Sequence, residues 1–285
     1  QIDEPVLSLD LDATWHAAFA PAYADLAQAG VKLLLSTYFD SAADHARLAS
    51  TLPVQGFHID LVRAPQQLDE WLSVLPADAV LSVGVIDGRN IWRADLRACL
   101  ERLQPLHASL GDRLWVAPSC SLLHVPVSLQ GEDRLDTDVR SWLAFATEKV
   151  DEIRLLGRAL NQGAVVVADA LQASDAAQQA RQQSRRVHSE LVQRRVRGMN
   201  DEMARRGQPY AARAELQRTA LGLPLLPTTS IGSFPQTSQI RQLRAAWRRG
   251  EVGSLDYLQR IRAEIELAVR KQEALGLDVL VHGEA

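Results

Sequence analysis

The regular alternation of short apolar runs with longer amphipathic stretches is the feature that most limits the fold of this chain. From residue 1 to about 160, the runs with strand character lie at a stub around Ile2 and at 31–39, 57–62, 80–86 and 114–117. The stretches with helical periodicity lie at 12–29, 41–51, 65–75, 92–109 and 137–160. Because neighbouring parallel strands must be joined by a crossover segment, this alternation predicts βαβ units and a parallel sheet.

The repeated units predict an α/β fold of the (βα)8 TIM-barrel family. No glycine-rich phosphate loop follows the predicted strands, which favours a barrel over a dinucleotide-binding sheet. The length of 285 residues is close to the typical size of one barrel, about 250 residues, but the pattern does not continue to the last residue. We expect residues 1–163 to form the C-terminal part of an N-terminal barrel.

An arginine-rich segment without strand character follows at 164–222. Between 172 and 219 it contains ten arginines and five acidic residues. Two interpretations compete: a basic face for an anionic partner, and a helical linker whose arginine stems cover its surface. Tyr210 is the one aromatic residue of that stretch, and base stacking needs aromatic side chains. We therefore expect a helical linker and no nucleic-acid partner.

A second domain is predicted to begin at residue 223. Pro224 and Pro227 set an extended entry, and a strand is expected at 228–231. Helices are expected at 237–249 and 254–275, with Gly276 as the C-cap of the second and a final strand at 277–282. Residues 223–285 are thus predicted to be the first β-α-β portion of a C-terminal catalytic barrel.

The composition excludes several classes of protein. With 47% hydrophobic residues and a net charge of −4, the chain is neither disordered throughout nor attracted as a whole to nucleic acid or an anionic membrane. Its apolar runs are far shorter than the roughly 20 residues of a membrane helix. Cys99 and Cys120 are its only cysteines, so we expect no disulfide framework and a cytoplasmic location.

Both ends have the pattern of an interrupted domain. The sequence begins at Gln1 without a methionine, and the predicted core strand at 277–282 lies three residues before the last residue. Since domains rarely end on a core strand, we expect an internal fragment of a longer protein. A processed but complete domain is the alternative.

The segment from Thr229 to Pro235 is the strongest local candidate for a binding site. Gly232 and Ser233 break the predicted strand, and their backbone N–H groups could face a ligand. Glu284 follows the last predicted strand at the equivalent position, where barrel enzymes collect their functional groups. A carboxylate beside exposed amides suits an amino acid, since Glu284 would accept from the ammonium group. The alternative is an ordinary strand-to-loop corner.

No metal site is supported by the spacing of histidines and cysteines. His282 is interpreted as a histidine at the rim of the core, because no His-x-x-His or Cys-x-x-Cys motif accompanies it.

Polar residues also follow the predicted strands of the first half. They comprise Asp3, Glu4, His58, Asp60, Asp87, Arg89, Asn90, Ser119, Cys120, Ser121 and His124. Together they resemble the rim of an active site, although each is a weak signal alone. Cys120 and His124 could form a nucleophile pair, but no third group that orients the histidine is evident.

Long motifs in both halves carry a resemblance to a known family. In the second half they run from Pro227 to Thr237 and from Leu275 to Ala285. Segments 1–5, 87–95 and 119–124 agree with the N-terminal half of the same family. With these motifs in the family's order, the chain closely resembles cobalamin-independent methionine synthase.

The resemblance implies a methyltransferase built of two (βα)8 barrels joined by a linker. It implies transfer of the methyl group of 5-methyltetrahydropteroyltri-L-glutamate to L-homocysteine, giving L-methionine without cobalamin. By the same resemblance, Ile231, Gly232 and Ser233 contact homocysteine or methionine, and Glu284 is the acidic contact to that amino acid.

The resemblance also implies that part of the chemistry lies outside this sequence. The family's zinc ligands and its proton-donating histidine fall beyond Ala285, so no catalytic or metal-ligating residue is assigned here. Zinc lowers the pKa of the homocysteine thiol, and the thiolate is the nucleophile. Without those ligands the chain is expected to be inactive.

Two features leave other interpretations open. Asp3, Glu4 and Cys120 look like echoes of C-terminal barrel residues, but Leu9 stands where a second acid is expected, so they are interpreted as relics of duplication. The alternatives for function are a related βα-barrel methyl or thiol transferase with another acceptor, and a non-catalytic binding or scaffold protein.

Overall fold

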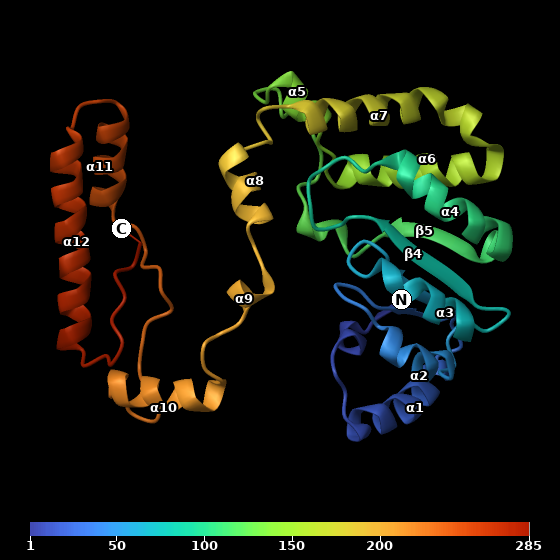
Figure 1. Ribbon diagram of the computed structural model, residues 1–285, viewed down its shortest axis with the longest axis horizontal. Coiled ribbons are helices and arrows are strands. Elements are labelled where there is room, and N and C mark those ends of the chain that lie inside the picture. The colour runs from blue at the N-terminus through green and yellow to red at the C-terminus, as the bar shows by residue number, and fades with distance from the viewer. Residues whose placement is uncertain (285) are drawn as a thin grey trace. The chain divides into compact units, whose positions relative to one another are not determined.

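A parallel sheet forms the centre of the first half of the molecule (Figure 1). The computed structural model describes residues 1–284 and divides the chain at residue 195 into two units. In the first unit, five strands pair in sequential order, each parallel to the next. They are β1 (Ile2–Asp3), β2 (Leu34–Ser36), β3 (Gly56–Asp60), β4 (Val80–Ile86) and β5 (Leu114–Pro118). This confirms the predicted α/β class and parallel sheet.

Helices connect successive strands, as the crossover rule requires. Those between strands are α1 (Ala13–Ala27), α2 (Ala46–Ser50), α3 (Leu68–Val74) and α4 (Leu96–Leu110), and three more helices follow β5, namely α5 (Thr137–Ser141), α6 (Ala146–Gln162) and α7 (Ala168–Gln183). The core between sheet and helices is made of apolar strand residues such as Leu35, Phe57 and Leu81, none of which is exposed. Buried leucines recur along α4 at 96, 100, 103, 106 and 110, the spacing of one helical face.

The prediction of a single helix at 137–160 is wrong, because the structure has two helices there, α5 and α6, with a break between them. The backbone at the break pairs instead with the loop after β4. Arg93 N donates to Trp142 O at 2.8 Å, and Ala144 N donates to Ile91 O at 2.9 Å. These bonds occupy backbone groups that a continuous helix would need for itself.

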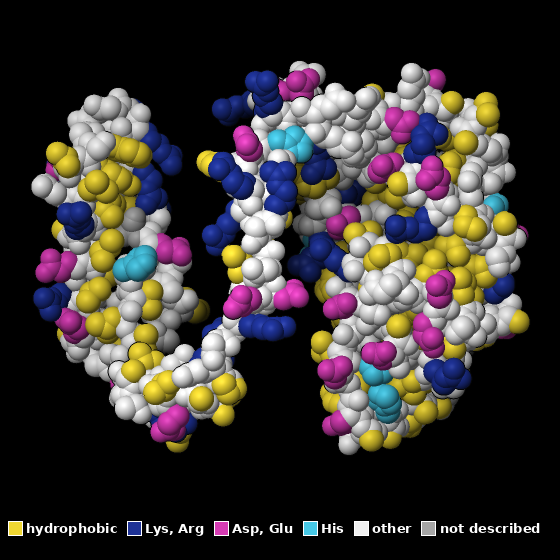
Figure 2. Space-filling model, viewed as in Figure 1, with side chains coloured by type: hydrophobic (Ala, Val, Ile, Leu, Met, Phe, Trp, Pro, Cys, Tyr) yellow, Lys and Arg dark blue, Asp and Glu magenta, His cyan; other side chains and the backbone are white. Residues whose placement is uncertain are grey.

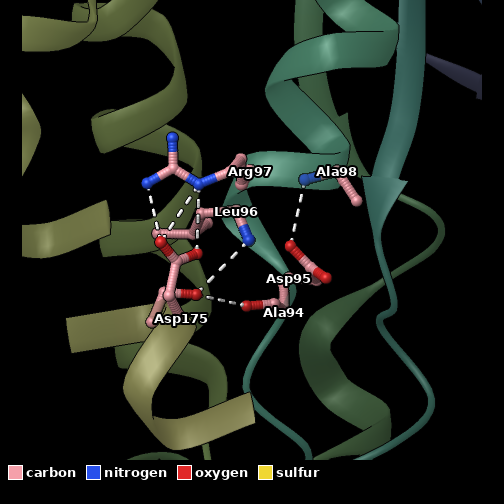
Figure 3. A network of polar contacts seen from close by, with 7 residues as sticks. Ala94, Asp95, Leu96, Arg97, Ala98 and Asp175 are labelled. Carbon is pink, nitrogen blue, oxygen red and sulfur yellow. Dashed lines mark hydrogen bonds and ion pairs between the residues drawn. The ribbon is translucent and has the colours of Figure 1, made fainter. Parts of the chain in front are cut away.

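The first unit extends further along the chain than the boundary predicted at residue 163. The helix α7 packs on it through Leu171 and Ala177, which are 4% and 7% exposed. Ser174 Oγ donates to Ala94 O at 3.0 Å, and Arg97 pairs with Asp175 at 2.6 Å (Figure 3). The unit therefore ends at Arg195. The assignment of the parts as barrel, linker and second barrel stays a prediction.

The second unit is mainly helical. Its helices are α9 (Asp201–Ala204), α10 (Tyr210–Leu221), α11 (Ser238–Arg248) and α12 (Ser254–Ala274), and α8 (Glu190–Arg197) crosses the boundary between the units. Trp247 and Tyr257 stack with ring centroids 4.7 Å apart and join α11 to α12. Figure 2 shows several basic side chains along the segment that contains α8, where Arg194, Arg195 and Arg197 are exposed.

The strands predicted at 228–231 and 277–282 do not form at that length. The structure gives one parallel bridge, between Thr229 and Val279. Within residues 196–284 no further strand pairs with this bridge, so its ladder has no neighbour to extend it. The C-cap of α12 is Leu275, one residue before the predicted Gly276. Gly276 follows it with φ +72°, and Leu277 N donates to Gln272 O at 3.1 Å, so the glycine lies just beyond the cap.

The helices of residues 1–284 do not include one with both the length and the apolar character needed to cross a bilayer.

Candidate functional site

The bridge between Thr229 and Val279 brings the two predicted site segments together. Thr228 donates to Asp278 Oδ2 twice, from its backbone N and from Oγ1, each at 2.8 Å. Thr229 Oγ1 donates to Val279 O at 3.1 Å. The bonds from Thr228 hold the pKa of the Asp278 carboxyl below its usual range, because they stabilise the charged form. The residues that follow each segment therefore emerge side by side.

Ser233 and Glu284 are in direct contact at the ends of these segments. Ser233 Oγ donates to Glu284 Oε2 at 2.9 Å, and Phe234 N donates to Gly283 O at 3.4 Å. The hydroxyl thus fixes one oxygen of a carboxylate on an exposed surface. Of the four predicted site residues, the structure joins these two by a hydrogen bond.

Ile231 and Gly232 lie on the same loop but do not touch Glu284 through a hydrogen bond. The Ile231 side chain is fully exposed, at 102% of its reference area. Gly232 N donates to Ser230 Oγ at 3.3 Å, and its φ of +121° lies in the region that favours glycine. The loop therefore presents backbone and one apolar side chain next to the Ser233–Glu284 pair.

Gly283 is required by the packing beneath Glu284. Its φ is +79°, and a Cβ added there would lie 2.1 Å from Cδ2 of Phe234. Glu284 itself has φ +56°, which is uncommon for a residue with a side chain. The turn that positions Glu284 therefore requires glycine at position 283, because any side chain there would clash with Phe234.

Gln272 is a site residue that the sequence did not reveal. It is 3% exposed on α12, where its Oε1 accepts from Val281 N at 2.9 Å and its Nε2 donates to Val281 O at 2.6 Å. It therefore pairs with the backbone just before His282 in place of a neighbouring strand. The feature of the sequence that could have indicated this role is a glutamine on the inner face of an amphipathic helix.

A cavity of about 340 Å³ opens beside the pair, between the two segments and the helices α11 and α12. Its lining is mostly apolar, with Phe234, Ile240 and Leu267, and it also includes Lys271 and Glu284. A carboxylate at the edge of an apolar cavity can orient a ligand that has both an amine and an apolar chain.

The polar rim predicted in the first half is largely occupied by structural contacts. His58 is 7% exposed, lies 2.9 Å from Ser82 Oγ through Nδ1 and 3.4 Å from Ser119 O through Nε2, and burial lowers its pKa. Asp60 accepts backbone N–H bonds from Phe39, Val62 and Arg63 at 2.9–3.0 Å. These groups hold loops in place.

Cys120 lacks the partner that a nucleophile needs. Its Sγ donates to Ser121 O at 3.8 Å, and burial raises its pKa, so the thiol form is favoured. The His124 ring packs against Phe39, with centroids 5.8 Å apart. The Cys120–His124 pair does not form. Across residues 1–284 there is also no group of three side chains suited to hold a metal ion.

Comparisons with known proteins match both halves of the chain. Residues 1–111 match the family model described as "Cobalamin-independent synthase, N-terminal domain", and residues 226–285 match "Cobalamin-independent synthase, Catalytic domain". This chain belongs to the cobalamin-independent synthase family.

Three similar relatives have the same name. A protein of Paraburkholderia xenovorans named 5-methyltetrahydropteroyltriglutamate–homocysteine methyltransferase is 63% identical over all 285 residues. Proteins of the same name from Ralstonia pickettii and Acidithiobacillus ferrooxidans are 56% and 54% identical over the whole chain. The chain spans 36–37% of the length of these relatives.

The two groups of polar residues described above lie in stretches that match different domains of the family. The Ser233–Glu284 pair lies in the stretch that matches the catalytic domain. His58 and Asp60 lie in the stretch that matches the N-terminal domain, where their bonds are structural. The candidate site for chemistry is therefore the pair in the second unit.

Proposed function

We propose that this chain is the part of a 5-methyltetrahydropteroyltriglutamate–homocysteine methyltransferase that supplies one side of the amino-acid site. The complete protein would transfer a methyl group from 5-methyltetrahydropteroyltri-L-glutamate to L-homocysteine and release L-methionine without cobalamin. The observation that carries this proposal is the 63% identity over every residue of the chain to a relative with that name.

In this proposal Glu284 binds the ammonium group of homocysteine or methionine. Its carboxylate is exposed and is oriented by the 2.9 Å bond from Ser233 Oγ. Backbone N–H groups of the loop formed by Ile231, Gly232 and Ser233 would donate to the carboxylate of the same ligand. Charge-assisted bonds of both kinds are about twice as strong as neutral ones. The apolar wall of the neighbouring cavity suits the aliphatic part of the amino acid.

The barrel fold and the zinc ion also belong to the proposal. Sequential parallel pairing of five strands is what part of a (βα)8 barrel would have. Zinc, when bound, would lower the pKa of the homocysteine thiol. The residues described here do not fit a zinc site, because none of them form a three-ligand group and burial favours the thiol form of Cys120. We assign no step of the reaction to a metal within this chain.

A cytoplasmic location remains our prediction from composition. It rests on the small number of cysteines, two in 285 residues, since disulfide-rich chains are typical of oxidising compartments.

The test compares variants in the complete reading frame that contains this sequence. Glu284→Gln removes the charge but keeps the shape, and should raise KM for homocysteine roughly 10- to 100-fold, the effect of losing one charged hydrogen bond. Ser233→Ala should give a smaller rise, because it only orients the carboxylate. Glu266→Gln is the matched control, since Glu266 is an exposed residue of α12.

Methyl transfer with unchanged KM in both variants would rule out the assigned roles. Transfer to another thiol in preference to homocysteine would favour the related transferase. A complete protein without any methyl transfer would favour a binding or scaffold role.

A further inference from the structure

A second cavity lies in the first unit, between the loop after β4 and the helices α4, α6 and α7. Its volume is about 490 Å³. Four basic side chains line it, namely Arg93, Arg102, Lys149 and Arg181. The proposed amino-acid site uses none of these residues.

Lys149 is the most unusual of the four because it is fully buried. Its exposed fraction is 0%, and its Nζ donates to Trp92 O at 3.0 Å, the one acceptor that the described residues offer it. An ammonium group has three donors. Burial lowers the pKa of Lys149, while Glu152 and Asp87 oppose that shift. A buried cation with donors to spare is expensive unless another acceptor reaches it.

Arg181 and Arg102 are held in place without carboxylate partners. The Arg181 guanidinium lies 3.8 Å from the centroid of the Trp92 ring, and Arg102 Nη1 donates to Leu61 O at 3.1 Å. Each contact fixes the position of the group and leaves its charge unneutralised. Guanidinium forks of this kind bind carboxylate and phosphate oxygens in pairs.

The helix α7 makes this wall rigid. Gln178 Nε2 donates to Arg93 O at 2.8 Å. One turn earlier, Ser174 bonds to the backbone of Ala94 and Leu96, and Asp175 pairs with Arg97 (Figure 3). The basic groups from α4, α6 and α7 are therefore positioned before any ligand arrives, which lowers the entropy cost of binding.

The acids that line the cavity are already engaged. Asp87 accepts from Arg89 N at 2.8 Å and from Asn90 Nδ2 at 2.7 Å. Asp95 caps α4 by accepting from Ala98 N at 3.0 Å. With four basic and two acidic groups, the lining has a formal charge of +2. The buried Glu152 lies near Lys149 and Arg93, and burial raises its pKa, which favours its neutral form. A ligand with two negative charges would balance the charge of the lining.

We propose that this cavity is a binding site for a small dianion, of the dicarboxylate or phosphate-monoester class. Arg93, Arg102 and Arg181 would donate to the oxyanions, and the positive charge of the buried Lys149 behind the cavity wall would add to their attraction. Trp92 would form an apolar wall.

Calorimetric titration of the purified chain tests this site. Hydrogen phosphate and succinate are the two probes, each added at low ionic strength, and acetate serves as the singly charged comparison. We expect saturable binding of one equivalent of at least one dianion, at least about tenfold tighter than acetate, as loss of one charged contact predicts. The probe that binds more tightly tells the phosphate class from the dicarboxylate class.

Variants locate the binding. Lys149→Met and Arg181→Gln should each weaken the affinity roughly 10- to 100-fold. Arg185→Gln is the matched control, because Arg185 is exposed on the segment after α7 and does not line the cavity. If Lys149→Met does not fold, Arg181→Gln decides. Absence of binding, or equal weakening by the control, would overturn the proposal. Because methyl transfer is not measured, this result is independent of the proposed function.

Discussion

Gln272 on α12 pairs with both backbone groups of Val281, with bonds of 2.9 Å to its N and 2.6 Å to its O. A single side chain thus replaces the strand neighbour that the final segment lacks. The Ser233–Glu284 pair lies immediately beyond it.

We expect Gln272→Ala to loosen this segment. Two part-buried backbone groups would lose their partners, and each would cost less than the roughly 1–3 kcal/mol of a fully buried unsatisfied group. The measurement is amide hydrogen exchange at Val281, which should accelerate strongly. Gln259→Ala is the control, because Gln259 lies on an exposed part of the same helix. Unchanged exchange in the Gln272 variant would contradict the role of this side chain.

The substitution Gly283→Ala should destabilise the second unit. The new Cβ would lie 2.1 Å from the Phe234 ring, at a φ of +79°. Strain of this kind costs about 1–3 kcal/mol, which urea unfolding can measure. Gly157→Ala provides a contrast of opposite sign. Gly157 lies within α6 with nothing within 4 Å of the new Cβ, so it should stabilise by up to about 1 kcal/mol.

Ser174→Ala should destabilise the first unit more than Arg97→Gln does. Ser174 is 2% exposed and its hydroxyl satisfies Ala94 O and Leu96 N, so its loss should cost about 1–3 kcal/mol. The Arg97–Asp175 pair has side chains that are 53% and 41% exposed, and solvent screens the attraction between them, so its loss should cost less. Urea midpoints of the two variants give the comparison. The reverse order would show that the ion pair, and not the hydroxyl, holds α7.

The stability of the first unit should fall as the pH is lowered through the pKa of unfolded histidine. Burial lowers the pKa of His58 in the folded state. Below a pH of about 6.5, the unfolded chain therefore binds a proton at this histidine while the folded chain does not. This contribution is complete above that pH and is lost as the pH falls towards the folded pKa.

Urea unfolding between pH 7.5 and 5 measures this dependence. Glu152 acts in the opposite direction, because burial raises its pKa and its proton is lost as the pH rises. The comparison with His58→Gln separates the two effects, since that variant should lose the histidine slope and keep the contribution of Glu152. Equal slopes in both proteins would contradict this prediction.

The sequence predicted the first unit well where burial alone determines structure. The strand predicted at 80–86 has the same bounds as β4, because a short apolar run rich in valine and isoleucine is typical of a parallel strand buried on both faces. In place of the strand predicted at 228–231, the structure has one bridge, between Thr229 and Val279. Strand pairing depends on neighbouring strands, which the pattern of one segment does not reveal.

The candidate site was predictable in part. Ser233 and Glu284 were expected at the ends of adjacent strands, and the structure has them 2.9 Å apart, while their ligand remains a prediction. The contacts of Gln272 and Lys149 were not predicted, because the sequence of a helix does not show which groups lie opposite its polar residues. Their roles follow from the packing of α12 and α6.

The packing of α7 determines where this chain can be divided for separate expression of its parts. A truncation at residue 163 would remove Ser174, Gln178 and Arg181, which contact the loop before α4. It would also remove Leu171 from the apolar cluster that includes the buried leucines of α4. A boundary after Arg195 leaves α7 attached. Protein engineers who wish to study the first unit alone should therefore retain the whole of α7, although the arginine-rich segment 164–222 in which it lies was predicted to be a linker.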